Sequence, residues 1–409
     1  MRCSIEIRKP VAFLVVSALA VLAANHVYPS AAGAKFPVAT TAEREFTASL
    51  AFDGTNFLVG LQGNGAAASH VGAQLVSPNG NRVGSLITTG HLGGVPLVAF
   101  DGTNYLIIWQ DCGIPCNNEL YGMFISPAGT AVGSPFLISS TIDDIAGLAF
   151  GGTTYLAVYY EEEARVVSFA RRVRGRLIAP NGTVGGELAI SSGYGNHGKN
   201  SIAFDGSNFL VVWVDDITDS PVMGRFVSTS GTLGTEITVN SSAFASDDLV
   251  SVAFDGTNYL VAWADQVGGS GGDWDLFGQL IDVGGSKVGS VIDVSTAQGT
   301  QRMPCLAFGE NTYLITWTDT RNDANGDFVC DGGEGSCIDI RGRAFTRSGS
   351  PEGPEVKINA EPGNQLVSPV VYGGSRFLVA WTDGDWIDGL VGDVFGAFIP
   401  PSLLFFRAD

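Results

Sequence analysis

The sequence is poor in charged residues, and positive charge is the scarcer sign. Only 15% of its 409 residues are charged, and 22 Lys and Arg stand against 41 Asp and Glu, giving a formal net charge of −19. Nucleic-acid binding needs a basic surface that neutralises phosphates. We therefore expect no nucleic-acid partner, and an acidic surface that serves solubility or attracts cations and basic partners.

Long apolar runs are missing after the N-terminal segment. The run Val11–Ala24 is too short for a membrane helix, which needs about 20 residues. It follows Arg2, Arg8 and Lys9 and precedes the small residues Ala31–Ala34, an order typical of a secretory signal peptide. We therefore predict a signal peptide over residues 1–34, cleavage after Ala34, no membrane span, and a protein that is secreted, periplasmic or on the cell surface.

Cysteine is also scarce, with six in the chain. Two close pairs, Cys112 with Cys116 and Cys330 with Cys337, are expected to form disulfides that staple loops in an oxidising compartment. Cys305 falls in a predicted strand, where we expect a buried free thiol and not a nucleophile.

Recognised catalytic signatures are absent from the sequence. It has no series of Asp-boxes and no His-Glu-x-x-His motif. Gly268–Gly272 matches Gly-x-Ser-x-Gly in its letters, but it is expected to be a flexible loop that precedes no helix, unlike a nucleophile elbow. These absences lower the enzyme hypothesis without excluding it.

What the chain does have is one phrase repeated along most of its length. At Ala99–Asp111 the phrase reads Ala-Phe-Asp-Gly-Thr-Asn-Tyr-Leu-Ile-Ile-Trp-Gln-Asp. Its copies begin at Ala51, Ala99, Ala149, Ala203, Ala253, Ala307 and Val371. Successive copies start 48, 50, 54, 50, 54 and 64 residues apart, which is the period of a four-stranded blade. The sequence therefore predicts an all-β fold, a seven-bladed β-propeller of four-stranded antiparallel blades.

Each copy contains four short strand signals. In the fifth they are Val250–Phe254, Asn258–Asp265, Asp275–Ile281 and Ser290–Ser295, and Asp255-Gly256 predicts a type I′ hairpin between the first two. The second strand is apolar on both faces, so each blade is expected to pack between two neighbours. Five copies share a Trp in this strand, which we expect in the core: Trp109, Trp213, Trp263, Trp317 and Trp381.

The two ends of the chain predict how the ring closes. The last copy lacks an outer strand, and residues 36–41 resemble the outer strands of other copies. We expect this N-terminal strand to join the last blade, which removes open sheet edges; Ser402–Phe406 is the alternative. Residues 35–409 would then form a single domain.

The phrase at Ala99–Asp111, with Tyr121-Gly122 and Ser126-Pro127-Ala128-Gly129 after it, resembles a class of secreted bacterial repeat proteins. The resemblance covers nearly all of the predicted mature chain. It implies a propeller-like fold and extracellular or surface residence. The class carries no agreed activity, so the resemblance assigns no catalytic residue.

The longer connections, from the second strand to the third and from blade to blade, share one face, where recognition is expected. One of them contains Asp323, Asn325, Asp327, Val329, Asp331 and Glu334. This spacing is that of an EF-hand-like calcium loop, with Val329 offering its carbonyl, but Phe328 stands where such loops need Gly. A structural Ca²⁺ site and a disulfide-stapled acidic loop without metal both remain open.

Acidic residues follow the core aromatic position by two in six copies. They are Asp111, Glu161, Asp215, Asp265, Asp319 and Asp383. Local caps of the loops are one interpretation. A ring of carboxylates that gathers cations or a basic ligand is the other.

Histidines and two further tryptophans complete the candidate binding residues. His70, His91 and His197 are all expected in the varied loops of this face, with Tyr194 near the last, and none shows metal-ligand spacing. Trp274 and Trp386 lie outside the repeated position beside aspartates, which suits stacking on a sugar ring as well as loop packing.

Three functions fit this sequence. The first is a non-catalytic binding or surface-interaction protein that recognises a glycan or an extracellular protein through the long-loop face. The second is a polysaccharide hydrolase or lyase using acidic and histidine residues at the pore mouth. The third is a structural assembly component, and the fold alone does not choose among them.

Overall fold

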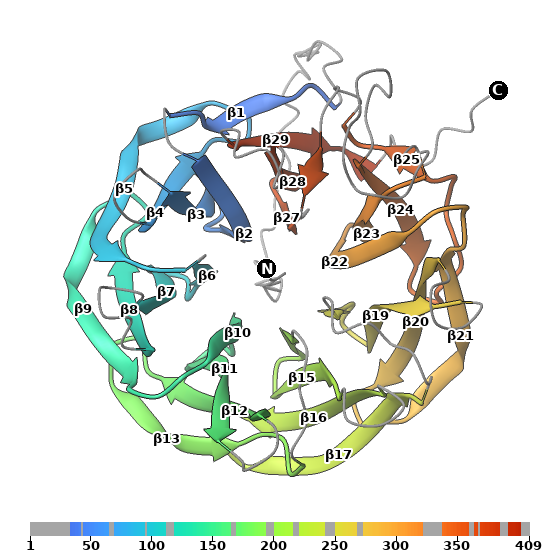
Figure 1. The fold of residues 1–409 in the computed structure, drawn as a ribbon, viewed down its shortest axis with the longest axis horizontal. Coiled ribbons are helices and arrows are strands. Elements are labelled where there is room, and N and C mark those ends of the chain that lie inside the picture. Colours follow the sequence, from blue (N-terminus) through green and yellow to red (C-terminus); the bar gives the residue numbers. More distant parts are fainter. Residues whose placement is uncertain are drawn as a thin grey trace, which may run out of the picture.

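The computed structural model describes residues 33–41, 44–64, 69–94, 96–111, 118–164, 169–193, 200–215, 221–241, 250–267, 273–321, 338–359, 364–366, 369–384 and 392–401. Their strands form seven antiparallel sheets, set in chain order around a central axis (Figure 1). The predicted seven-bladed β-propeller is confirmed.

Each blade runs outward from the axis as an inner, a second, a third and an outer strand (Figure 1). From blade 1 to blade 7, the inner strands are β2 (Arg44–Phe52), β6 (Leu97–Phe100), β10 (Asp144–Phe150), β14 (Ser201–Phe204), β18 (Ser251–Phe254), β22 (Gln301–Gly309) and β27 (Val370–Gly373). The second strands are β3 (Phe57–Asn64), β7 (Tyr105–Asp111), β11 (Tyr155–Ala164), β15 (Asn208–Val214), β19 (Asn258–Gln266), β23 (Thr312–Asp319) and β28 (Arg376–Asp383). The third strands are β4 (Ser69–Val76), β8 (Glu119–Ile125), β12 (Phe169–Ile178), β16 (Val222–Ser228), β20 (Trp274–Asp282), β24 (Asp339–Thr346) and β29 (Asp393–Ile399). The outer strands are β5 (Arg82–Leu92), β9 (Ala131–Ser139), β13 (Val184–Ala189), β17 (Leu233–Asn240), β21 (Lys287–Ser295), β25 (Val356–Lys357) and β1 (Phe36–Ala39), and the short β26 (Gln365–Leu366) also pairs with β28.

The hydrophobic core is divided among the interfaces between neighbouring blades. Seven clusters of buried side chains each draw from two adjacent sheets. Between blades 1 and 2, for example, Leu58 packs with Tyr105 and Trp109. A blade thus has both faces covered, which explains why its second strand is apolar on both sides.

The five repeated tryptophans are core residues, as predicted. Each is at most 1% exposed. Burying such a ring removes about 150–250 Å² from water, worth roughly 4–6 kcal/mol as an upper bound. The repeat therefore places its largest apolar side chain at each blade interface.

The Asp-Gly hairpins differ from the predicted type I′ turn. Asp255 flanks the turn, and its Oδ1 accepts the backbone N–H of Thr257 and of Asn258, each at 2.7 Å. Gly256 is then the first central residue, with φ of 94°, and positive φ is absent at Thr257. Positive φ at the first central residue alone is the type II′ pattern. The prediction was wrong because the Asp carboxylate caps the turn instead of entering it.

The last two blades lack this aspartate and do form type I′ turns. Glu310 and Asn311 have φ of 48° and 71°, and Gly374 and Ser375 have φ of 57° and 65°. Positive φ at both central residues is what type I′ requires.

The same hairpin turn also accepts a hydrogen bond from the next blade. The hydroxyl of Tyr259, in blade 5, donates to the carbonyl of Asn208 in the blade 4 turn at 3.3 Å. Burial and the charge of Asp205 raise the pKa of Tyr259, which keeps this hydroxyl protonated. Equivalent bonds run from Tyr105 to Asn56, Tyr155 to Asn104, and Tyr313 to Asn258.

A tyrosine at this position occurs together with an aspartate in the hairpin turn of the preceding blade. The four pairs are Asp53 with Tyr105, Asp101 with Tyr155, Asp205 with Tyr259, and Asp255 with Tyr313. In the other three interfaces, Gly replaces the Asp of one blade's turn and Phe replaces the Tyr of the next blade: Gly151 with Phe209, Gly309 with Phe377, and Gly373 with Phe57. At Gly151 a Cβ would lie 2.4 Å from Cζ of Phe209, so that ring occupies the space of the missing side chain. The identity of one blade's turn is therefore matched to its neighbour.

Inner strands are also joined from blade to blade. The hydroxyl of Ser251 accepts the backbone N–H of Leu306 at 3.1 Å, and Ser49 and Ser201 do the same for Val98 and Val252. Cys305 holds the equivalent position in blade 6; it is buried and forms no disulfide within the described part of the chain, as predicted.

The N-terminal strand closes the ring, as predicted. β1 pairs antiparallel with β29, with Phe36 opposite Gly396. The Phe36 ring stacks on Phe398 at 5.1 Å and packs on the cluster between blades 7 and 1. Residues 402–406, the alternative closing segment, lie outside the described residues.

Replacing Phe36 by Ala should weaken ring closure. The variant loses the ring that joins β1 to two blades, and we expect a loss of roughly 2–3 kcal/mol, below that of a fully buried Phe. Denaturant unfolding measures this loss. Pro37→Ala, at an exposed position of the same strand, is the control and should change little. Equal stability of the native and Phe36→Ala proteins would contradict the closing role.

Candidate functional site

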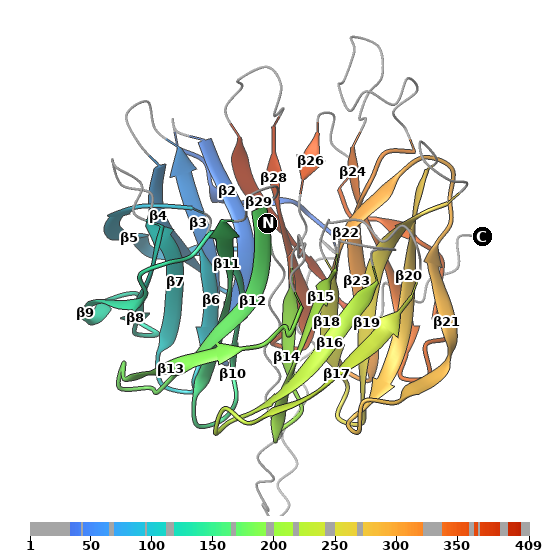
Figure 2. The same ribbon diagram turned by 60° about the horizontal axis from the view of Figure 1, so that its bottom comes forward.

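The second strands end on one edge of the ring, the upper edge in Figure 2, as β3 and β28 show. We call this edge the loop-rich face, because the connections to the third strands begin there. Loops on such a rigid scaffold commonly carry recognition. The candidate site is therefore sought among the strand ends that border these connections.

Most of the six carboxylates at or near the ends of the second strands have a positive neighbour. The pairs are Asp111 with His91, Glu161 with Arg174, Asp319 with Arg321, and Asp383 with Lys35. Asp319 also accepts the backbone N–H of Arg321 at 3.1 Å, as an Asx turn does. These contacts favour local caps over a ring of carboxylates that gathers cations.

The carboxylates also face like charges across the blade. The directly opposite residue of the third strand is acidic in four blades: Asp111 and Glu119, Asp265 and Asp275, Asp319 and Asp339, and Asp383 and Asp393. Like charges at directly opposite positions destabilise an antiparallel pair. Each pair therefore needs a positive group from elsewhere, or a proton.

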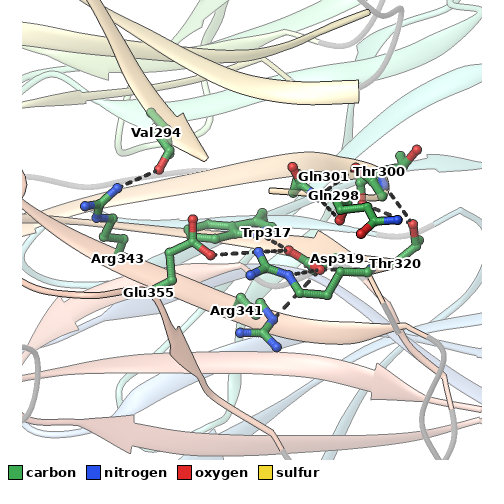
Figure 3. A network of polar contacts seen from close by, with 12 residues as sticks. Val294, Gln298, Thr300, Gln301, Trp317, Asp319, Thr320, Arg341, Arg343 and Glu355 are labelled. Carbon is green, nitrogen blue, oxygen red and sulfur yellow. Dashed lines mark hydrogen bonds and ion pairs between the residues drawn. The ribbon is translucent and has the colours of Figure 1, made fainter. Parts of the chain in front are cut away.

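Blade 6 balances its pair with a buried ion network (Figure 3). Arg321 binds the fully buried Asp319 through Nε to Oδ1 at 2.7 Å and Nη2 to Oδ2 at 2.6 Å. The indole N–H of Trp317 donates to the same carboxylate at 2.9 Å. Arg321 also reaches Glu355 at 2.7 Å. One guanidinium thus ties the end of β23 to the residue before β25.

The second acid of this blade has its own cation. Lys357 Nζ lies 2.8 Å from Oδ1 of Asp339, which is also fully buried. Arg341 Nε lies 3.8 Å from Asp319 (Figure 3). Removing one member of so buried a network would leave a charge uncompensated. The network therefore fixes the strand ends from which residues 322–337 leave the blade.

Blade 7 is balanced by the closing segment. Lys35 Nζ lies 2.5 Å from Asp383 and 3.7 Å from the ring centroid of Phe395. Burial and Asp383 raise the pKa of Asp393, and Lys35 lowers it. Ring closure and charge balance in this blade thus come from adjacent residues.

Blade 5 holds several carboxylates at close quarters. Burial and the charges of Asp273 and Asp293 raise the pKa of Asp275. Trp274 is half-buried against the cluster between blades 5 and 6, and the guanidinium of Arg302 lies 5.1 Å from its ring centroid. Trp274 is therefore packed on one side and covered by a cation.

The junction of blades 1 and 2 gathers aromatic and acidic side chains. His91, from β5, has its Nδ1 3.5 Å from Oδ2 of Asp111. The His91 ring lies 5.3 Å from the Trp109 ring and stacks on Tyr121 at 5.8 Å. The Tyr121 hydroxyl donates to Glu119 at 3.2 Å. We call these five residues the blade 1–2 cluster.

The cluster is partly open to solvent. The side chains of His91 and Asp111 are 35% and 17% exposed, whereas Trp109 is fully buried. Burial and the charges of Glu119 and Asp111 raise the pKa of Tyr121, so its hydroxyl remains a donor. The Trp109 indole N–H has no hydrogen-bond partner among the described residues, and the same is true of Trp263 and Trp381.

The structure brings two of the predicted binding residues, His91 and Asp111, together. The prediction that His70 and His91 lie in loops was wrong, because strand pairing extends through both residues: His70 is exposed on β4 and His91 lies on β5. Asp215 donates its backbone N–H to the carbonyl of Pro221 at 2.9 Å. Several predicted residues lie outside the described part of the chain: Tyr194, His197, Trp386, the loop residues Asp323, Asn325, Asp327, Val329, Asp331 and Glu334, and the cysteines Cys112, Cys116, Cys330 and Cys337. Within the described part, no group of three or more His, Cys, Asp or Glu side chains is placed to hold a metal ion. The described residues also include no helix long and apolar enough to cross a membrane.

Sequence reasoning missed Tyr121 and Glu119 as site residues. Both are set by the pairing of the second and third strands, which puts Tyr121 opposite Trp109 and Glu119 opposite Asp111. Aligning the third strands of the repeats on the second strands would have found them.

No protein-family model and no curated protein matches this chain. Solved structures do share its fold. The β-propeller domain of the Trilobed protease from Pyrococcus furiosus is 10% identical with a TM-score of 0.52, covering 87% of this chain and 95% of that one. An acylaminoacyl peptidase from Pyrococcus horikoshii is 9% identical with a TM-score of 0.52, covering 88% and 53%. The endosialidase of phage phi92 is 10% identical with a TM-score of 0.54, covering 90% and 68%. At these identities the likeness supports the propeller fold alone.

Replacing Asp275 by Asn should raise the melting temperature at neutral pH. The pKa of Asp275 is higher in the folded state than in the unfolded state, so the folded protein binds this proton more tightly. The resulting stabilisation of the folded state is lost as pH rises through the folded-state pKa. Asn removes the charge, and the gain should shrink as pH falls toward the ordinary Asp value of 3.8. Thermal unfolding across this pH range measures the effect. A gain that is the same at all pH values would contradict the electrostatic cause.

Proposed function

We propose that this protein is an exported, non-catalytic binding module that recognises a glycan through its loop-rich face. The blade 1–2 cluster is the contact site. This cluster is the observation that carries the proposal.

The side-chain chemistry of the cluster suits a sugar. Sugar rings stack on aromatic faces, and their hydroxyl groups bond to carboxylates and amides. The cluster offers the rings of His91 and Tyr121 and the carboxylates of Asp111 and Glu119. The amide of Gln110, next to Asp111, points toward Asn118 at 3.4 Å, so amides border the same strand ends.

Binding without hydrolysis is favoured by the state of the acids. Glycoside hydrolysis needs two carboxylates with different roles, one a protonated acid and one a base or nucleophile. In blades 6 and 7 the acids that end the second strands are held by Arg321 and Lys35. Such ion pairs suit a structural role for these acids and leave the blade 1–2 cluster as the contact site.

The proposal is tested by a glycan array and by pull-down on insoluble polysaccharides, with release of reducing ends assayed on every polymer that is bound. We expect binding without release. Release of new ends would contradict the non-catalytic part, and silence in both assays would contradict glycan recognition. Repeating the assay with Ca²⁺ and with a chelator tests whether the predicted loop at 323–334 contributes.

A matched pair of variants places the site. Tyr121→Ala should lower binding about ten-fold or more, because stacked aromatic side chains contribute strongly to such contacts. Phe277→Ala is the control, since Phe277 stands opposite Trp263 in blade 5 as Tyr121 stands opposite Trp109 in blade 2. Equal losses in the two variants would argue against the blade 1–2 cluster.

A further inference from the structure

We propose that the side chains of Lys35 and Asp383 form an amide bond, which joins the closing strand β1 covalently to the last blade. Asp393 is the acid that relays the protons of this reaction. The inference does not depend on glycan binding, because it concerns blade 7 and not the blade 1–2 cluster.

The first argument is proximity. Nζ of Lys35 lies 2.5 Å from Oδ2 of Asp383, although the two residues are 348 apart in the chain. The carbon that the amine would attack is bonded to this oxygen, so the two reacting groups already touch. The ring of Phe395 also contacts the amine, with Nζ 3.7 Å from the ring centroid. Holding two reactive groups in contact replaces a bimolecular reaction by an intramolecular one, which lowers the barrier strongly.

The second argument is an acid beside the reacting pair. Asp393 stands directly opposite Asp383 across β28 and β29. Burial and the charge of Asp383 raise the pKa of Asp393, and Lys35 lowers it. Amide formation needs a group that takes a proton from the amine and gives one to the leaving oxygen. A carboxyl group with a raised pKa beside a second carboxylate is an arrangement that suits such proton transfers.

The bonds and protons of the reaction balance. Asp393 in its acid form donates its proton to the carboxylate of Asp383 and then accepts one from the ammonium of Lys35. The freed lone pair of Nζ forms the bond to Cγ of Asp383. The bond from Cγ to the protonated oxygen breaks, and this oxygen leaves as water with a second proton from the nitrogen. The amide nitrogen keeps the third proton, and Asp393 ends in its acid form.

Blade 6 has the same kind of ion pair in a different setting. Lys357 Nζ lies 2.8 Å from Oδ1 of Asp339, and Asp319 stands opposite Asp339. The oxygens of Asp319 accept hydrogen bonds from Arg321 and from the indole N–H of Trp317. Such bonds favour the ionised form of a carboxylate. The opposing acid of blade 6 is therefore not available as a proton donor, and we expect this blade to keep its ion pair.

The bond would secure the short strand that closes the ring. β1 has four residues and pairs with β29 at Phe36, Pro37 and Ala39. Like charges at directly opposite positions destabilise a strand pair. The amide removes the charge of Asp383, so its conflict with Asp393 disappears and no lone ammonium remains. A covalent link between distant residues also restricts the unfolded chain, as a disulfide does.

Mass spectrometry of the exported, purified protein tests the bond after any disulfides have been reduced. We expect an intact mass one water molecule below that of the mature sequence. Trypsin should release the peptide ending at Arg44 joined to residues 377–407, one water lighter than the two peptides together. It should still cut after Lys357, because blade 6 forms no amide. A full intact mass with two separate peptides would overturn the proposal, and a second cross-link at Lys357 would overturn the role of Asp393.

Two variants separate the reaction from folding. Lys35→Arg keeps the positive charge beside Asp383 but removes the amine, so its mass should be full. Asp393→Asn keeps both reacting groups and should leave most of the protein unjoined, since a positioned acid contributes about 100-fold or more to such reactions. Circular dichroism checks that both variants fold. Complete joining in Asp393→Asn would overturn the proton relay, and a loss of water in Lys35→Arg would overturn the assignment to Lys35. The mass of the native protein decides whether the bond exists even where a variant fails to fold.

Discussion

The contact that the rest of this structure depends on is the one between a hairpin turn and the second strand of the next blade. A propeller blade cannot bury its two apolar faces alone, so every blade needs its neighbours in a fixed register. In blade 4, for example, Asp205 caps its own turn, and the carbonyl of Asn208 in that turn accepts a hydrogen bond from the hydroxyl of Tyr259 in blade 5. In blade 3 the aspartate is missing, and Gly151 leaves its place to the bare ring of Phe209 from blade 4.

This coupling has a direct bearing on the candidate site. The blade 1–2 cluster takes His91 from one blade and Trp109 and Tyr121 from the next. The same two blades are joined at the opposite end of their strands by the bond from Tyr105 to Asn56. A site shared between blades keeps its geometry only if the blades do not slide, so the structural contact on one face serves recognition on the other.

Much of the fold was predictable because the repeat carries it. The period of the repeat predicted the number of blades, and the shared Trp position predicted the core. The strand-like segment at residues 36–41 predicted the closing strand, which the structure forms at Phe36–Ala39. The turn type was mispredicted because the dipeptide preference of Asp-Gly ignores that the Asp side chain caps the turn from outside it. The site was less predictable: His91 and Asp111 are 20 residues apart in the numbering and meet only through the packing of β5 against blade 2. Tyr121 and Glu119 depend on strand register, which the repeated phrase does not contain.

For the acidic residues, position follows from the repeat, whereas the positive partner often comes from a distant part of the chain. The sequence placed a carboxylate after each second strand in six blades, but its partner differs from blade to blade. Arg321 follows its acid by two residues, whereas Lys35 reaches Asp383 from the other end of the chain. A sequence pattern can therefore locate such an acid without revealing whether it is neutralised.

The account is tested most directly by a double-mutant cycle on Asp205 and Tyr259. Each single change, Asp205→Gly or Tyr259→Phe, should cost about 1 kcal/mol of unfolding free energy. The double variant recreates the Gly and Phe pair of blades 3 and 4, and it should cost less than the two single changes together by about 0.5–1 kcal/mol. The cycle of Asp205→Gly with Tyr313→Phe, which joins a different pair of blades, should be additive. Additive losses in both cycles would contradict the claim that the turn of one blade is matched to the strand of the next.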